Sequence, residues 1–94
     1  MIILKHDIVI DVSQSNYTLM LDKKSKDKNG KPIYEVLGYY ASLSSAIRGA
    51  KEHYIRKRLD EEVFPLNKAI EEVRRISDEF AAMLTAATGE GGKT

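Results

Sequence analysis

Apolar residues in the first forty positions cluster in short, β-branched and aromatic-rich segments, a pattern typical of strands. Turn-forming residues separate them: Ser-Gln-Ser-Asn at 13–16 and Asn29-Gly30, the strongest short hairpin signal in the chain. The sequence therefore predicts a three-stranded antiparallel meander, and a fourth short strand at Ile2–Leu4 is left open. The three segments are IVIDV (8–12), YTLMLD (17–22) and PIYEVLGYY (32–40).

The two turns also predict a register. A first turn over 13–16 pairs Val12 with Tyr17, and a two-residue Asn29-Gly30 turn pairs Leu19 with Tyr40. Because directly opposed residues share a face of the sheet, one face is expected to be apolar and the other mixed. The predicted apolar face comprises Ile8, Ile10, Val12, Tyr17, Leu19, Leu21, Tyr34, Val36 and Tyr40.

The rest of the chain has helical periodicity. A first helix is expected over about 43–59, with Ser42 or Ser44 as its N-cap, and a second over about 65–87, starting at Pro65. The second helix is long, so we expect its apolar seam to extend beyond the core from Phe80 onward. That seam consists of Leu66, Ile70, Val73, Ile76, Phe80, Met83 and Ala87.

These elements define an α+β fold in which an antiparallel meander is followed by two helices. The 94 residues suit one small domain, predicted over 1–88, with a flexible tail at 89–94. The chain has no cysteine and no long apolar span, and it carries charges from Lys5 onward. A cytoplasmic protein without disulfides or a membrane helix is therefore expected.

Charge is unevenly distributed although the formal net charge is only +1. Residues 23–58 hold ten basic and three acidic side chains, whereas residues 59–80 hold three basic and seven acidic ones. The basic residues are candidates for contact with nucleic acid or an acidic partner. Against nucleic acid stand the low net charge and the use of lysine at hairpin ends to prevent edge-to-edge association. The candidates are Lys23, Lys24, Lys26, Lys28, Lys31, Arg48, Lys51, Arg56, Lys57 and Arg58.

Two apolar surfaces are candidates for self-association or for a protein partner. The first is the seam of the second helix, which suggests a homodimer through the C-terminal helix. The second is the mixed face of the sheet, which still carries large apolar side chains. The candidate interface residues are Val73, Ile76, Phe80 and Met83 on the helix, and Met20, Leu37 and Tyr39 on the sheet.

Catalytic and cofactor sites are not expected. ATGEGGKT (87–94) matches a loose phosphate-loop pattern, but a helix precedes it and no helix follows to bind phosphate. His6 and His53 lack partners at metal-ligand spacing, and the adjacent acids have no nucleophile or base beside them. We therefore predict no enzyme activity, no catalytic residue, no cofactor and no metal.

Half of the chain resembles small uncharacterised proteins encoded by phages and prophages of Gram-positive bacteria. The resemblance runs from NYTLML through KNGKPIYEVLGYYASLSSAIRGA to IRKRL, and its centre is GYYxSLxxAI (Gly38 to Ile47). It implies an accessory protein of a mobile element that acts in the host cytoplasm. The expected function is a non-enzymatic interaction module, an inhibitor or modulator of a host defence (restriction or CRISPR-type) or replication protein. The alternative is a nucleic-acid-binding accessory protein.

Overall fold

The computed structural model describes the backbone of residues 1–92 and the side chains of residues 1–86. It divides into two compact units, residues 1–46 and residues 47 onward, and each unit is described by itself. The single domain expected over 1–88 therefore stays a prediction. Of the expected tail at 89–94, the side chains and the last two residues lie outside the described part of the chain.

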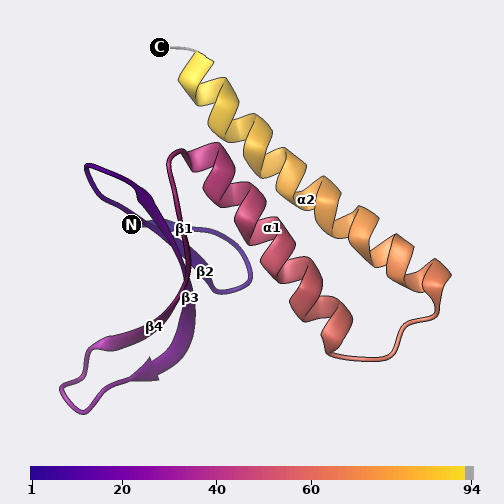
Figure 1. Cartoon of the computed structure of the whole chain (residues 1–94), viewed down its shortest axis with the longest axis horizontal. Helices are drawn as coiled ribbons and strands as arrows, with labels where there is room; N and C mark the ends of the chain where they lie inside the picture. The colour runs from indigo at the N-terminus through magenta and orange to yellow at the C-terminus, as the bar shows by residue number, and fades with distance from the viewer. Residues whose placement is uncertain (93–94) are drawn as a thin grey trace. The chain divides into compact units, whose positions relative to one another are not determined.

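The first unit is an antiparallel sheet of four strands in chain order (Figure 1). These strands are β1 (Ile2–Ile3), β2 (Ile8–Val12), β3 (Tyr17–Lys26) and β4 (Pro32–Tyr40). The sheet confirms the meander, and the short strand left open at the start of the chain is present. Between β2 and β3 the register is the predicted one, with Val12 opposite Tyr17 and Ile8 opposite Leu21.

The β1–β2 connection is a tight turn that contains no glycine. His6 and Asp7 have φ values of 62° and 63°, and the Ile8 amide donates to the Lys5 carbonyl at 3.3 Å. Two consecutive positive φ values and this bond define a type I′ turn, which matches the twist of an antiparallel pair. Histidine and aspartate are among the residues that tolerate this conformation best.

The predicted register between β3 and β4 is wrong. The Asp27 amide donates to the Lys31 carbonyl at 2.8 Å, so the loop has three residues instead of two. Asp27 Oδ1 also accepts from the amides of Asn29 and Lys31, and only Gly30 of this loop takes a positive φ, 81°. This is the three-residue hairpin geometry with glycine in the left-handed position. The signal for this loop in the sequence is Asp27, three residues before Gly30, whose side chain organises the loop.

A bulge in β4 then changes which of its residues share a face. Met20 is opposite Val36 while Leu19 is opposite Gly38, so Leu37 is an extra residue on β4. Such a bulge reverses the side-chain alternation beyond it. Val36 consequently lies on the face of Met20 and is 49% exposed, instead of joining the predicted apolar face. Tyr34 is opposite Asp22 and therefore also lies on the face of Met20, not on the predicted apolar face.

The helices α1 (Leu43–Asp60) and α2 (Leu66–Gly92) follow the sheet. Ser42 is the N-cap of α1: its Oγ accepts from the Ser45 amide at 3.2 Å and its carbonyl from the Ala46 amide at 3.1 Å. The Pro65 carbonyl accepts from the Ala69 amide at 3.0 Å, so Pro65 immediately precedes α2. The backbone of α2 is helical beyond the predicted end near residue 87.

The core of each unit is small. In the first unit Ile8, Val9, Ile10, Leu19 and Ala46 are buried, and in the second Ile47, Ala50, Ile76 and Phe80 are. Burial of Val9, which is adjacent to Ile8 and Ile10 on a strand, shows that both faces of β2 contribute. Neither helix carries, within its described residues, the length of apolar sequence needed to cross a membrane.

The seam of α2 leaves the core at the end opposite to the expected one. Phe80 is fully buried and its ring lies 6.4 Å from that of Tyr54 on α1. Leu66 and Ile70, by contrast, are 77% and 48% exposed. The expectation that the seam extends beyond the core from Phe80 onward is therefore wrong for Phe80, which is fully buried, and Met83 is half-buried. The large exposed apolar residues of the described seam lie instead in the first two turns of the helix, and Ala87 lies outside the described side chains.

Candidate interaction surfaces

The end of the β3–β4 hairpin carries five of the predicted basic residues, and two of these are engaged in ion pairs. Lys23 Nζ lies 3.2 Å from Glu35 Oε1, and Lys24 Nζ lies 3.3 Å from Asp7 Oδ1 and 3.7 Å from Asp22 Oδ2. The hydrogen bond to Asp7, together with the negative charges of Asp7 and Asp22, raises the pKa of Lys24. These two lysines therefore balance charge within the sheet.

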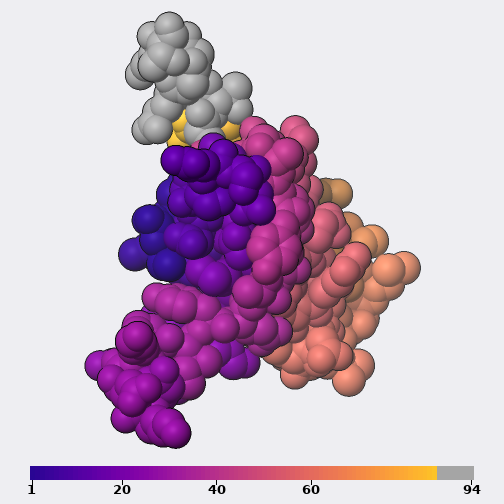
Figure 2. Space-filling model, turned by 60° about the vertical axis from the view of Figure 1, so that its left-hand side comes forward, coloured from indigo at the N-terminus to yellow at the C-terminus, as the bar shows by residue number. Residues whose placement is uncertain are grey.

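The other three lysines of the hairpin end are exposed. Lys26, Lys28 and Lys31 make no ion pair with any side chain in the described part of the structure. Asp27 fixes the backbone between them through its hydrogen bonds to the amides of Asn29 and Lys31. This end of the hairpin projects at the lower left of Figure 2. We call Lys26, Lys28 and Lys31 the free lysines.

An exposed apolar patch lies on the same two strands. Val36 is directly opposite Met20, and Tyr39 is opposite Thr18, so the three apolar side chains share one face of the sheet. Tyr39 is 66% exposed, and Met20 is half-buried. Of the predicted sheet interface, Met20 and Tyr39 therefore lie together, whereas the half-buried Leu37 is the bulge residue and Val36 takes its place. We call Met20, Val36 and Tyr39 the sheet patch.

The basic residues of α1 do not form one set. Arg48, Arg56 and Lys57 are exposed and have no ion-pair partner within the residues that the structure describes, and Lys51 is half-buried. Arg58 differs from all of these because carboxylates of three residues contact its guanidinium. It is therefore not available to a phosphate or to an acidic partner.

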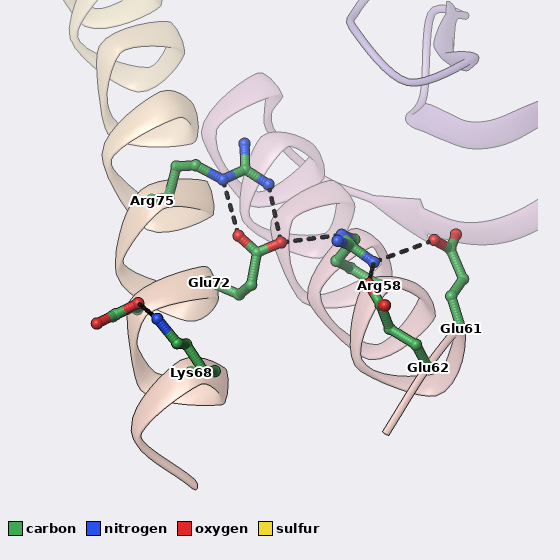
Figure 3. A network of polar contacts seen from close by, with 7 residues as sticks. Arg58, Glu61, Glu62, Lys68, Glu72 and Arg75 are labelled. Carbon is green, nitrogen blue, oxygen red and sulfur yellow. Dashed lines mark hydrogen bonds and ion pairs between the residues drawn. The ribbon is translucent and has the colours of Figure 1, made fainter. Parts of the chain in front are cut away.

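Arg58 lies at the centre of a polar network that joins the two helices of the second unit (Figure 3). Its Nη1 is 2.9 Å from Glu62 Oε1 and 3.5 Å from Glu61 Oε2, and its Nε is 2.9 Å from Glu72 Oε1 on α2. The guanidinium also lies over the Phe64 ring, 5.2 Å from the centroid. Arg75 Nε donates to the other Glu72 oxygen at 2.9 Å.

These contacts shift the proton affinities of the network. The hydrogen bond from Arg75, followed by the positive charges of Arg75 and Arg58, lowers the pKa of Glu72 despite its partial burial. Hydrogen bonding to Glu62 raises the pKa of Arg58, and hydrogen bonding to Glu72 raises that of Arg75. Glu72 is therefore ionised at neutral pH and bridges two arginines.

A hollow of about 410 Å³ lies beside this network. Its walls combine the apolar α1–α2 connection, where Val63 is 98% exposed, with charged side chains of both helices. The charged residues of this hollow are already paired. Arg58 contacts Glu72, which also contacts Arg75, and Lys68 lies 3.6 Å from Glu71. The arrangement is that of a charge-balanced helix connection. The lining residues are Arg58, Val63, Phe64, Pro65, Lys68, Glu71 and Glu72.

The predicted helix interface is only partly accessible. Ile76 and Phe80 are completely buried and belong to the core, while Val73 and Met83 are half-buried. Among the described residues of α2, the large exposed apolar ones that the predicted interface did not contain are Leu66 and Ile70. Their signal was in the sequence, since both belong to the seam, but periodicity does not tell which end of a long helix is covered.

Comparison with known proteins gives no relative from which a site could be transferred: no protein-family model, no curated protein and no solved structure matches this chain. Among the residues that the structure describes, no group of three or more histidine, cysteine or acidic side chains could hold a metal ion. The phosphate-loop-like segment at 87–94 lies outside the described side chains.

Proposed function

We propose that this chain is a non-enzymatic protein-interaction module that binds a host protein through the β3–β4 hairpin. The observation that carries the proposal is the combination of the sheet patch with the free lysines on the same two strands. Exposed Tyr39 offers a large apolar surface with a polar hydroxyl, which is characteristic of interface cores. The free lysines, farther out on the same hairpin, add positive charge, which favours a partner that has aspartate and glutamate near an apolar surface.

The class of partner follows from the resemblance to phage and prophage proteins. A small accessory protein of a mobile element gains most from binding a host protein whose activity it alters. We therefore propose a defence protein of the restriction or CRISPR type, or a replication protein, as the target, in the cytoplasm of the host. Inhibition or modulation would then result from occupying a surface of that target, without chemistry by this chain.

The test is a comparative pull-down from lysates of several Gram-positive hosts. Tagged wild-type protein is compared with Tyr39→Asp, which places a charge in the sheet patch, and with Val63→Asp, which places one at an exposed position of the other unit. We expect one stoichiometric protein with the wild type and with Val63→Asp, and its loss with Tyr39→Asp. Recovery of the same proteins by all three baits would contradict the proposal.

Binding of nucleic acid is the second candidate, and the free lysines favour it. Three cations at one hairpin end can contact neighbouring phosphates, and they are unpaired in the described structure, as are Arg48, Arg56 and Lys57. Three phosphate contacts would give a slope of roughly −3 in log affinity against log salt concentration. Titration of labelled DNA and RNA at two salt concentrations measures this slope, and no salt-sensitive binding at micromolar protein would exclude the candidate.

A further inference from the structure

A mostly apolar stripe, which begins with the seam residues Leu66, Ile70 and Val73, lies along α2, about a quarter-turn away from the side that packs on α1. Ile76 and Phe80 mark the packed side, since both are buried and Phe80 contacts Tyr54. At 100° per residue, six other positions project within one narrow sector. Two of the six are large and exposed, one is an exposed alanine, and three are half-buried. We call them the α2 stripe: Leu66, Ile70, Val73, Ser77, Ala81 and Leu84.

We propose that the α2 stripe binds the same stripe of a second copy, so that two α2 helices pack antiparallel about a twofold axis. In an antiparallel pair centred at residue 75, two residues lie at the same level when their numbers add up to 150. Leu66 then meets Leu84 of the other copy, and Val73 meets Ser77. Ile70 is level with residue 80 of the other copy, one residue from Ala81, so large side chains lie near small ones in the middle of the contact.

Charge complementarity supports this arrangement. Arg74 and Asp78 border the stripe on the side away from α1, and both are exposed. On the same helix Lys68 pairs with Glu71 and Arg75 with Glu72, but neither Arg74 nor Asp78 makes an ion pair within the described residues. In the antiparallel register Arg74 of one copy lies about 3 Å along the axis from Asp78 of the other. The twofold axis makes this contact twice.

The size of the contact indicates a weak dimer. From Leu66 to Leu84 the stripe is about 27 Å long, and a single helix pair buries less surface than a standard interface. We expect association in the micromolar range. The proposal is independent of the host-protein proposal, because the α2 stripe and the sheet patch belong to different units and share no residue.

The first experiment measures mass against concentration by sedimentation equilibrium, from micromolar to submillimolar protein. We expect a shift from the 10.6 kDa monomer toward the dimer. Ile70→Glu should raise the dissociation constant by at least about a hundredfold, since the buried charge is introduced twice. Ala82→Glu is the matched control, because Ala82 is exposed on the other side of α2 and should leave the dimer unchanged.

A charge swap tests the register. Arg74→Asp and Asp78→Arg should each raise the dissociation constant by roughly tenfold, because attraction turns into repulsion at two symmetric contacts. The double variant exchanges the two charges and should restore wild-type affinity. A monomer throughout the concentration range, or a dimer unaffected by Ile70→Glu, would overturn the proposal. A double variant weaker than both single variants would overturn the antiparallel register.

Discussion

At the scale of single residues, Gly30 determines the end of the β3–β4 hairpin. Its φ of 81° lies in the left-handed region, and a Cβ added there would meet no atom within 4 Å. Any cost of a side chain at this position is therefore backbone strain and not a clash. The three-residue loop needs this conformation to return the chain to Lys31.

Gly30→Ala should weaken the loop by about 1–2 kcal/mol, the cost of the left-handed conformation for an L-residue. The Asp27 amide, which donates to Lys31, then exchanges with solvent about tenfold faster, as measured by NMR hydrogen exchange. Gly30→Asn is the control, because asparagine tolerates positive φ. Equal exchange rates in the two variants would show that φ at this position does not limit the loop.

Ser42 and Ser44 give a second prediction at this scale, since the sequence allowed either as the N-cap of α1. The structure selects Ser42, whose Oγ accepts from the Ser45 amide. Ser42→Ala should lower the free energy of unfolding by about 1 kcal/mol, whereas Ser44→Ala should change it by only a few tenths. Urea unfolding followed by circular dichroism measures both, and a larger loss from Ser44→Ala would contradict the assignment.

At the scale of elements, the sequence predicted what local chemistry determines. The β2–β3 register was correct because a four-residue turn and the apolar alternation agree on it. The β3–β4 register was wrong because the Asp27 side chain lengthens the loop and Leu37 forms a bulge. A bulge depends on tertiary packing, and no residue pattern in the strand predicts it.

For the candidate surfaces too, the sequence predicted the local features and missed those that depend on contacts between residues distant in sequence. Sequence correctly located the basic residues but could not tell which are neutralised, because ion pairs such as that of Lys24 with Asp7 join residues that are far apart in the sequence. The ion-pair partners of Arg58 include both local and distant residues. Glu61 and Glu62 are close in sequence, whereas Glu72 approaches only when the two helices pack side by side. Exposure of Leu66 and Ile70 likewise required the packed helix pair.

The Arg58–Glu72 contact predicts a pH-dependent stability for the second unit. Glu72 has its pKa lowered from the ordinary 4.5, so its ionised form stabilises the folded state above that value, and the contribution is lost as pH falls through the lowered pKa. Glu72→Gln should therefore lower the Tm at pH 7, with the difference from wild type disappearing under acid conditions. Glu71→Gln is the control, because Glu71 is exposed and, within the described residues, pairs only with Lys68. A difference that persists at low pH would show that packing, not charge, is responsible.

At the scale of the whole molecule, the uneven charge is reduced by internal pairing. Of the ten basic residues between 23 and 58, Lys23, Lys24 and Arg58 are engaged with acidic residues. The free lysines remain as a compact positive site, although the formal net charge of the chain is only +1. Electrostatic attraction to a partner therefore depends on unpaired basic residues such as the free lysines more than on the net charge.

Because the free lysines and the α2 stripe lie in separate units, a change in one of these surfaces should leave binding through the other unchanged. Reversing the free lysines with Lys26→Glu, Lys28→Glu and Lys31→Glu should leave the Tm nearly unchanged, because none of the three is ion-paired in the described structure. The same variant should weaken association with the host protein or with nucleic acid, through a slower association rate that depends on salt. Self-association through the α2 stripe should stay at its wild-type strength.

Ile70→Glu should show the reverse behaviour: a monomer by sedimentation equilibrium that still associates with the partner of the sheet patch. Measuring both properties in both variants separates the two proposals, since each variant disables one surface and serves as the folded control for the other. Loss of both properties in either variant, with the Tm unchanged, would mean that a single surface serves both contacts. The α2 stripe and the sheet patch would then have to act together, and their assignment to independent partners would be wrong.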